Sequence, residues 1–256
     1  MSHRYDLHLH SRASADCRTP YRALIAMARR RGLSGLALTD HDTLDGFAAL
    51  TKIWPHSELQ LIAGCERTLF DGSHVIGLFL SRNLTATTAR EVIGEIRAQG
   101  GLVYLPHPCR AYSGLLGAGS QHSAADRDWA IEEADVIEIF NRKCTPEENA
   151  LALELLDRYP RKAYAAASDA HYAHEIGYAC TEFNEPLSRE TFRPTGAFTP
   201  PAHLAAELSS FRHADSASSL RTQLRATAKA LGLLNPARSV RNYIRSYRQP
   251  RLQKYR

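Results

Sequence analysis

The feature that most constrains the fold of this chain is a repeated alternation of short apolar runs with longer amphipathic runs between residues 5 and 183. The apolar runs are predicted strands at 5–10, 33–40, 59–65, 74–80, 102–105, 136–140 and 162–167. The amphipathic runs are predicted helices at 20–32, 44–54, 88–99, 129–134 and 146–159. Strands that alternate with helices favour a parallel sheet covered by helices, and continuous apolar strands indicate that both faces of the sheet are buried. The sequence therefore predicts an α/β protein whose parallel sheet is open or closed into a barrel.

Charge divides the chain into a body and a tail. Residues 216–256 contain ten basic residues and no acidic one, whereas residues 1–215 contain 22 basic and 27 acidic residues. Residues 186–201 are rich in proline and threonine, as is typical of a connection. We therefore expect a main domain at 1–185, a connecting segment at 186–215 that packs on it, and a basic helical tail at 216–256.

The tail carries a row of arginines. Arg238, Arg241, Arg245 and Arg248 are spaced to line one face of a helix. Such a face can bind nucleic-acid phosphates, lie on an anionic membrane or dock on the acidic body of another subunit. A solvated helix with no specific partner is the remaining alternative, and the oligomeric state stays open.

Nothing in the sequence indicates export or a membrane span. No apolar run approaches the ~20 residues needed to cross a bilayer, and the N-terminal residues lack the apolar core of a signal peptide. The five cysteines are scattered without a CxxC pair, which is typical of a reduced chain. We therefore expect a cytoplasmic protein.

Most predicted strands end in, or begin with, a side chain that can bind a metal ion. In parallel α/β folds, functional groups gather at the carboxyl ends of the strands, so these side chains are expected to meet. Strand geometry also points His8 and His10 to the same side. The candidate ligands are His8, His10, Asp16, His41, Glu66, His74, His107, Asp169 and His171. Imidazole and carboxylate suit Mn, Fe or Zn, and nine ligands exceed the needs of one ion, so we expect two or three divalent ions bridged by Glu66 or Asp169.

These residues lie in short ordered motifs that carry a family resemblance. The motifs are DLHLHS at 6–11, TDHDT at 39–43, GCE at 64–66, HP at 107–108 and SDAH at 168–171. Their order and spacing resemble those of the PHP (polymerase and histidinol phosphatase) family, over roughly residues 5–184. The resemblance implies a distorted (β/α)7 TIM-like barrel, here with a basic helical C-terminal extension, that hydrolyses phosphate esters with two or three bound metals. The segment EIGYACTEF at 175–183 resembles the stand-alone phosphoesterases of the family, and we expect no polymerase module.

The resemblance also implies how the ligands divide among the ions. His8, His10, Glu66 and Asp169 would serve one ion, Asp16, His41 and His171 a second, and His74 and His107 would help to hold a third. His74 lies in the least diagnostic stretch, GSHVIGL at 72–78.

Phosphate recognition needs cations besides the metals. Arg110 follows the HP motif and Arg142 follows the run 136–140, so both are expected at the same strand-end face. Arginine there binds phosphate oxygens in bidentate fashion. Asp169, His171, Arg110 and Arg142 are therefore the predicted catalytic residues, with Arg18 and Lys143 as second choices.

Neighbouring residues receive other interpretations. Asp40 and Asp42 are candidates to orient ligand imidazoles, and Asp42 is alternatively a helix cap before residue 44. Cys65 and Cys109 are interpreted as packing residues. The loop GLLGAG at 114–119 lacks the order of a phosphate-binding loop and is interpreted as a flexible segment or lid near the site.

The leading hypothesis is a metal-dependent phosphoesterase in which metal-activated hydroxide attacks phosphorus and Arg110 or Arg142 takes up the developing charge. Because the body is acidic, a small phosphorylated metabolite or a nucleotide is the expected substrate. An exonuclease or phosphodiesterase that uses the basic tail to hold oligonucleotide ends is the alternative.

Two further functional classes are less favoured by the sequence. A metal-dependent amidohydrolase is disfavoured because no lysine stands where a metal-bridging lysine is expected, and Lys162 begins its strand at the wrong end. A metal-holding module without activity ranks last because all nine candidate ligands are present. The natural substrate, monoester or diester preference and the identity of the metal stay open.

Overall fold

The computed structural model describes residues 3–190 and residue 192, and the predicted basic tail and most of the predicted connecting segment lie outside these residues. The described elements, in chain order, are β1 (His3–Leu9), α1 (Tyr21–Arg30), β2 (Gly35–Leu38), α2 (Asp45–Thr51), β3 (Gln60–Thr68), β4 (His74–Leu78), α3 (Ala89–Arg97), β5 (Leu102–Leu105), α4 (Ala124–Glu133), β6 (Val136–Asn141), α5 (Pro146–Leu153), α6 (Leu155–Arg158), β7 (Ala163–Ala167), the 3-10 helix η1 (Ala173–Glu175) and β8 (Thr181–Phe183). Every predicted strand is present. The helix predicted at 146–159 is divided into α5 and α6, and α4 begins earlier than predicted.

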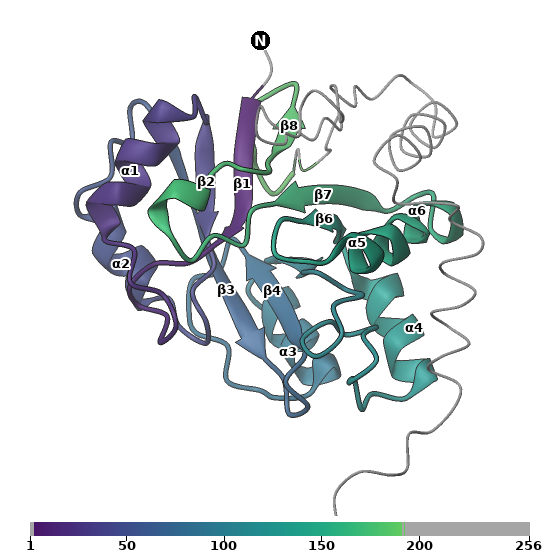
Figure 1. The fold of residues 1–256 in the computed structure, drawn as a ribbon. Coiled ribbons are helices and arrows are strands. Elements are labelled where there is room, and N and C mark those ends of the chain that lie inside the picture. The colour runs from purple at the N-terminus through teal and green to yellow at the C-terminus, as the bar shows by residue number, and fades with distance from the viewer. Residues whose placement is uncertain (1–2, 191, 193–256) are drawn as a thin grey trace, which may run out of the picture.

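The strands form one sheet that curls almost into a closed barrel (Figure 1). Their order is β7-β6-β5-β4-β3-β2-β1-β8, so the first seven strands lie side by side in the order of the chain. The two ends of that series meet where Leu9, at the end of β1, forms a parallel bridge with Ala170, just after β7. The predicted (β/α)7 TIM-like barrel is therefore confirmed.

The expectation that the sheet is parallel throughout is wrong at two places. β4 runs antiparallel to both β3 and β5, and β8 runs antiparallel to β1. Only a short turn joins β3 to β4, and a turn of that length returns the chain antiparallel, since a parallel crossover needs a dozen residues or more. β8 has three residues, too few for a periodic signal in the sequence.

Local sequence signals account for the ends of several helices. The Thr88 side chain accepts a hydrogen bond from the backbone N–H of Glu91 at the start of α3. Thr145 and Glu148 form a reciprocal capping box at the start of α5. After α1, Gly32 has φ +62°, the left-handed conformation that glycine adopts without strain at helix ends.

Three apolar clusters hold the barrel and its helices together. Leu24 and Ala28 of α1 pack with Leu36 of β2, and Val92 and Ile96 of α3 pack with strand residues on another side. The third cluster is drawn from strands around the whole barrel and therefore fills its interior; it contains Tyr5, Leu7, Ala37, Ile62, Ile76, Leu78, Tyr104, Val136, Ala165, Phe183 and Leu187.

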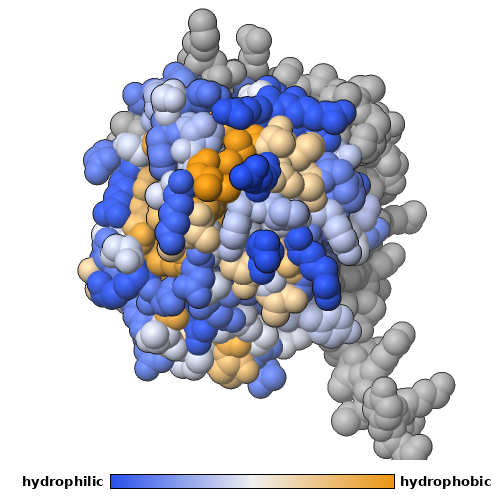
Figure 2. All heavy atoms as spheres, turned by 90° about the vertical axis from the view of Figure 1, so that its left-hand side faces the viewer, coloured by the Kyte–Doolittle hydropathy of each residue, from blue (hydrophilic) through white to orange (hydrophobic). Residues whose placement is uncertain are grey.

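The outer surface is polar where helices cover the sheet. The face on the side of α1 and α2 is mostly hydrophilic with scattered apolar areas (Figure 2). Within the part of the chain that the structure describes, no helix is both long and apolar enough to cross a membrane.

Candidate metal centre

The nine candidate ligands come from seven places along the chain and meet at one edge of the barrel. His8 lies in β1, Glu66 in β3, and His74 is the first residue of β4. The others lie in the loops that follow β1, β2, β5 and β7, and comprise His10, Asp16, His41, His107, Asp169 and His171. The sequence predicted that Glu66 follows its strand, at 59–65. In the structure Glu66 lies within β3, which continues to Thr68. Because β4 is antiparallel to β3, its first residue lies at the same edge as the ends of the parallel strands.

Glu66 is at the centre of the cluster. Its carboxylate is 1% exposed and is surrounded by imidazoles from five histidines. The nitrogen–oxygen distances are 3.1 Å to His8, 3.2 Å to His10, 3.4 Å to His41, 2.8 Å to His74 and 3.0 Å to His107. One carboxylate among so many imidazoles is the arrangement expected of a group that bridges several cations.

Asp169 and Asp16 complete the ring of donors. Asp169 Oδ1 lies 3.6 Å from His8 Nε2, 3.4 Å from His10 Nε2 and 3.5 Å from His171 Nδ1. Asp16 Oδ2 lies 3.0 Å from His171 Nε2 and 3.5 Å from His41 Nε2. The carboxylates therefore alternate with imidazoles across the whole site.

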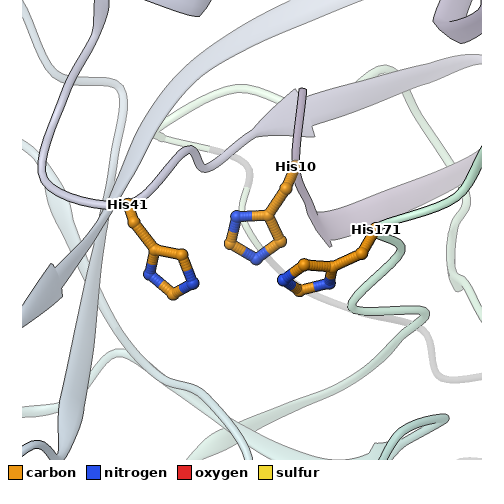
Figure 3. Close-up of side chains that lie close together, drawn as sticks. All are labelled: His10, His41 and His171. Atoms are coloured by element: carbon orange, nitrogen blue, oxygen red, sulfur yellow. The ribbon is translucent and has the colours of Figure 1, made fainter. Parts of the chain in front are cut away.

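The donor atoms fall into overlapping groups of three, each compact enough to hold one ion. The groups are His8, His10 and Glu66; His8, His107 and Asp169; His41, Glu66 and His74; and His10, His41 and His171, and within each the donor atoms lie within 4.8 Å of one another. Figure 3 shows the last group, with its three rings converging from separate segments of the chain. His10 belongs to two groups, so it lies between the positions predicted for the first and second ions. The assignment of residues to particular ions stays a prediction.

Three ring nitrogens indicate that the donor set fits metal ions. His10 Nε2, His41 Nδ1 and His107 Nδ1 are buried and make no hydrogen bond within the described residues. Buried polar atoms without a partner are costly, so these sites call for a ligand. For His10 and His41, the unpartnered nitrogens lie within 3.4 Å of a Glu66 oxygen, the geometry expected where donor atoms share a cation. Imidazole with carboxylate is a donor set for Mn, Fe or Zn.

The cluster is buried on one side and open on the other. The side chains of His8, His10, Glu66 and Asp169 are at most 3% exposed. His41 is 22% exposed, His171 20% and Asp16 53%. The cluster is therefore accessible to solvent from the side of Asp16, His41 and His171.

Burial and mutual attraction act against each other on the ionisable groups. Burial alone raises the pKa of the Glu66 carboxyl, but the surrounding histidines, first among them His8, lower this pKa well below its ordinary value. Burial alone lowers the pKa of the His10 imidazole, but Asp169 and Glu66 raise this pKa to about 9. The carboxylates are thus held in the ionised form that binds cations.

Two buried residues of β6 were missed by the sequence analysis. Glu138 Oε1 lies 3.3 Å from His8 Nδ1, and the Asn141 side chain donates to Glu138 at 3.0 Å and to Asp169 at 3.3 Å. Both side chains are 1% exposed. The available signal was a single acid in the otherwise apolar run 136–140, since a buried charge requires a partner.

Of the two aspartates proposed to orient imidazoles, one does so indirectly. Asp40 accepts a hydrogen bond of 2.8 Å from the Ser14 hydroxyl, which lies 3.2 Å from His10 Nδ1. Asp42 instead accepts from Arg67 at 2.7 Å, and its proposed role as a helix cap is wrong because α2 begins at Asp45.

The predicted phosphate-binding arginines differ in position. Arg110 Nη1 lies 3.1 Å from Asp169 Oδ2, and its side chain is 35% exposed, so it lies at the edge of the cluster. Arg142 makes no ion pair with the candidate ligands among the described residues, and its Nε is buried without a hydrogen-bond partner. Of the second choices, Lys143 pairs with Glu175, and Arg18 is exposed.

The loop at 114–119 is packed, in contrast to the flexible lid expected. Leu115 is 1% exposed, and the backbone N–H groups of Gly114 and Gly117 donate to Arg110 and Gly114. A Cβ on Gly117 would lie 2.0 Å from the carbonyl oxygen of Arg110, so only glycine fits there. Cys65 packs in an apolar cluster, where burial raises the pKa of its thiol to about 12.

Comparison with known sequences identifies the family. The profile of the PHP domain matches residues 6–105, and the profile described as PHP-associated matches residues 146–192. The chain belongs to the PHP family. As a PHP protein it is a metal-dependent hydrolase of phosphate esters.

The relatives of the chain differ in how much of it they match. An uncharacterized protein from Methanocaldococcus jannaschii is 29% identical over 182 residues, which cover 70% of this chain and 70% of that protein. The phosphoribosyl 1,2-cyclic phosphate 1,2-diphosphodiesterase of Eggerthella lenta is 30% identical over 89 residues, 33% of this chain and 34% of that enzyme. The 5'-3' exoribonuclease of Haemophilus influenzae is 35% identical over 92 residues, 35% of this chain and 33% of that enzyme. The similarity to these two enzymes therefore spans about a third of their length.

A solved structure shares the fold. It is a two-domain protein from Bacteroides vulgatus that contains a predicted PHP-like metal-dependent phosphoesterase, with a TM-score of 0.59 and 18% identity. The match covers 71% of this chain and 58% of that protein. The barrel of this PHP protein is thus shared with a protein of very different sequence.

Proposed function

We propose that this PHP protein hydrolyses the phosphate ester of a nucleotide or another small metabolite at the cluster around Glu66. The observation that carries the proposal is the convergence of five imidazoles on one buried carboxylate, with an open side lined by Asp16, His41 and His171. Divalent ions bound there would supply Lewis-acid activation of the phosphoryl group and of the attacking water. His8, His10, Glu66 and Asp169 would hold ions on the buried side, and Asp16, His41 and His171 on the exposed side.

Arg110 is the residue we propose for binding the phosphate itself. Its guanidinium lies beside Asp169 and its side chain is 35% exposed, so part of it is accessible to a ligand. A guanidinium there would bind the oxygens of the transferred phosphoryl group and offset the charge that develops on them. His171 lies 2.9 Å from the Asp169 carbonyl oxygen through Nδ1 and faces Asp16 through Nε2, so it would hold an ion with Asp16 at the same side.

Exposed aromatic residues favour a nucleotide over other phosphorylated metabolites. Phe70 is 56% exposed, Tyr112 85% and Tyr172 63%. They belong to the segments that follow Glu66, His107 and His171, respectively, so each lies close in sequence to a candidate ligand. Aromatic rings of this kind stack on nucleobases, at about 1–3 kcal/mol per base. The sequence similarity to a ribonuclease supports a substrate with nucleobases, whereas the similarity to a phosphoribosyl cyclic phosphate diesterase supports only a small ribose phosphate.

An exonuclease acting on oligonucleotide ends is the second candidate. The 35% identity to a 5'-3' exoribonuclease over 92 residues favours it. The basic residues at 216–256 would hold the rest of the nucleic acid and would make binding strongly salt-dependent.

The amidohydrolase alternative finds no support at the site. Lys162 donates to the backbone carbonyl of Ala134 at 3.0 Å and to that of Glu132, away from the candidate ligands. Among the described residues, no lysine forms an ion pair with a carboxylate of the cluster, and Lys143 pairs with Glu175 instead.

The test is hydrolysis of a panel of nucleoside monophosphates, other phosphomonoesters and short oligonucleotides with Mn, Zn or Fe added. Asp169→Ala is compared with Asp128→Ala, which removes an exposed carboxylate on α4, and with a chain truncated after Asp215. We expect phosphate release from a mononucleotide that Asp169→Ala abolishes and the other two variants retain. Turnover of oligonucleotides alone, lost on truncation, would favour the exonuclease. No turnover of any ester by a metal-loaded protein would contradict both.

A further inference from the structure

A buried acid outside the predicted ligand set makes four close contacts, two of them with candidate metal ligands. Glu138, in the middle of β6, is 1% exposed. Its Oε1 accepts from the Tyr104 hydroxyl at 2.8 Å and lies 3.3 Å from His8 Nδ1. Its Oε2 accepts from the backbone N–H of His107 at 2.5 Å and from the Asn141 side chain at 3.0 Å. Every acceptor position of the carboxylate is therefore directed at a specific partner.

The contact with His8 selects one form of that imidazole. A carboxylate only accepts hydrogen bonds, so His8 donates from Nδ1 and carries its proton there. In a neutral ring the other nitrogen, Nε2, then has a free lone pair. That nitrogen is the one that lies 3.1 Å from Glu66 and 3.6 Å from Asp169, in the direction of the predicted ions.

The second oxygen of Glu138 acts on two further ligands. His107 has φ 28°, a backbone conformation that is strained for a residue with a side chain, and its N–H is held by Glu138. Asn141 reaches from Glu138 to Asp169, which also has a positive φ, 53°. One buried carboxylate thus connects to three of the nine candidate ligands.

We propose that Glu138 is a positioning residue that fixes the metal-binding tautomer of His8 and holds the backbone of His107 for metal binding. The inference rests on the proposed function only in assuming that His8 binds a metal through Nε2. Outer partners of metal-bound histidines typically change metal affinity by about 10–100-fold when they are replaced.

The first measurement is the tautomer of His8 in the wild-type protein, by long-range ¹H–¹⁵N NMR of zinc-loaded, ¹⁵N-histidine-labelled protein. We expect the proton on Nδ1 and zinc on Nε2. The opposite tautomer, or a His8 whose two nitrogens are unaffected by zinc, overturns the proposal. This readout needs no substrate, so it is independent of whether any ester is hydrolysed.

The second measurement is zinc affinity, by competition with a chelator, in Glu138→Gln and in two matched controls. The glutamine keeps the volume of the side chain, but its amide can donate to His8 Nδ1 and favours the other tautomer. Tyr104→Phe removes a neutral donor from the same oxygen and leaves the contact with His8. Glu95→Gln alters a carboxylate that accepts three hydrogen bonds from Thr85 and Ala86, away from the cluster.

We expect Glu138→Gln to weaken zinc binding by about 10–100-fold, and both controls to stay within about threefold of the wild type. An unchanged affinity in Glu138→Gln overturns the proposal. The proposal is also overturned if Glu95→Gln weakens zinc binding as much as Glu138→Gln does when the two variants lose the same amount of melting temperature. That result would assign Glu138 a general structural role. If wild-type protein binds zinc with the expected tautomer but hydrolyses no ester, the positioning role stands and the proposed function fails.

Discussion

Asp6 accepts hydrogen bonds from both the side chain and the backbone of Ser168. The hydroxyl donates at 2.5 Å and the N–H at 3.1 Å, and the backbone N–H of Gly177 adds a third donor at 2.8 Å. Asp6 lies in β1, two residues before His8, whereas Ser168 directly precedes Asp169. The pair therefore connects the first strand to the loop after β7, across the place where the barrel closes.

We predict that Asp6→Ala lowers both stability and metal binding. The change leaves two buried donors of Ser168 without an acceptor, at a cost of about 1–3 kcal/mol for each unsatisfied group, and removes the acceptor of a half-buried N–H of Gly177. For a chain of this length a loss of about 3 kcal/mol lowers the melting temperature by about 6–12 °C. Calorimetry and metal analysis of the purified variant measure the two effects. A melting temperature within about 1 °C of the wild type would contradict the prediction.

Replacing Glu66 tests the centre of the cluster. Glu66→Gln keeps the size of the side chain but removes the charge that five imidazoles share. We expect at least one fewer bound metal ion per chain. We also expect the rate of hydrolysis to fall by more than about 100-fold, the upper end of the effect of replacing a residue that only orients a metal ligand. Elemental analysis and steady-state kinetics measure these quantities, and Glu95→Gln is the control for a general effect of losing a carboxylate.

The two arginines predicted to bind phosphate are expected to behave differently. Arg110 contacts Asp169, and Arg142 makes no such contact. Arg110→Gln should therefore reduce kcat/KM by about 10²–10³, the effect of losing one preorganised donor to a developing anion, while metal content is retained. We expect Arg142→Gln to change kcat/KM by less than about tenfold. A larger loss in Arg142→Gln than in Arg110→Gln would reverse the assignment.

Acid should weaken the turn between β3 and β4 through Asp71. Ser73 donates to Asp71 through its hydroxyl at 2.6 Å and its N–H at 3.0 Å, and the N–H of Gln121 donates at 2.8 Å. Burial opposes ionisation, but these hydrogen bonds and His122 lower the pKa of the carboxyl below its ordinary value of 3.8.

Because the folded pKa is the lower one, the stabilisation is present above pH 3.8 and is lost as the pH falls through the folded value. Urea unfolding from pH 5 to pH 2 should show a steeper loss of stability in the wild type than in Asp71→Asn. The exposed Asp128→Asn is the control and should follow the wild type. Parallel curves for wild type and Asp71→Asn would refute the expectation.

Local pattern was enough to predict the strands, most helices and the residues that meet in the site. Each predicted strand is a short apolar run, and burial on both faces of a sheet leaves that pattern in any sequence. His8 and His10 are two residues apart at the end of such a run, and Asp169 and His171 repeat the spacing after the last one. Residues at the ends of parallel strands converge whatever the loops do, so their meeting could be foreseen.

The position of His74 was decided by the direction of its strand. At the start of a parallel strand His74 would lie at the far edge of the barrel, and only the antiparallel course of β4 brings it within 2.8 Å of Glu66. Strand direction depends on pairing with neighbours and on the intervening turn, and the apolar pattern of the strand itself is the same either way.

The roles of Glu138 and Asp42 were likewise decided by tertiary contacts. Glu138 contacts His8, which is 130 positions away in the chain. Asp42 accepts a hydrogen bond from Arg67 of the neighbouring strand, although the sequence suggested that Asp42 caps the next helix. A carboxylate finds its partner by proximity in space, which spacing along the chain does not record. The sequence by itself thus determined which chemistry this protein carries and at which edge of the barrel. The tertiary structure decided which atoms face one another there, because hydrogen bonds and ion pairs form only between groups that the folded chain brings within about 3–4 Å.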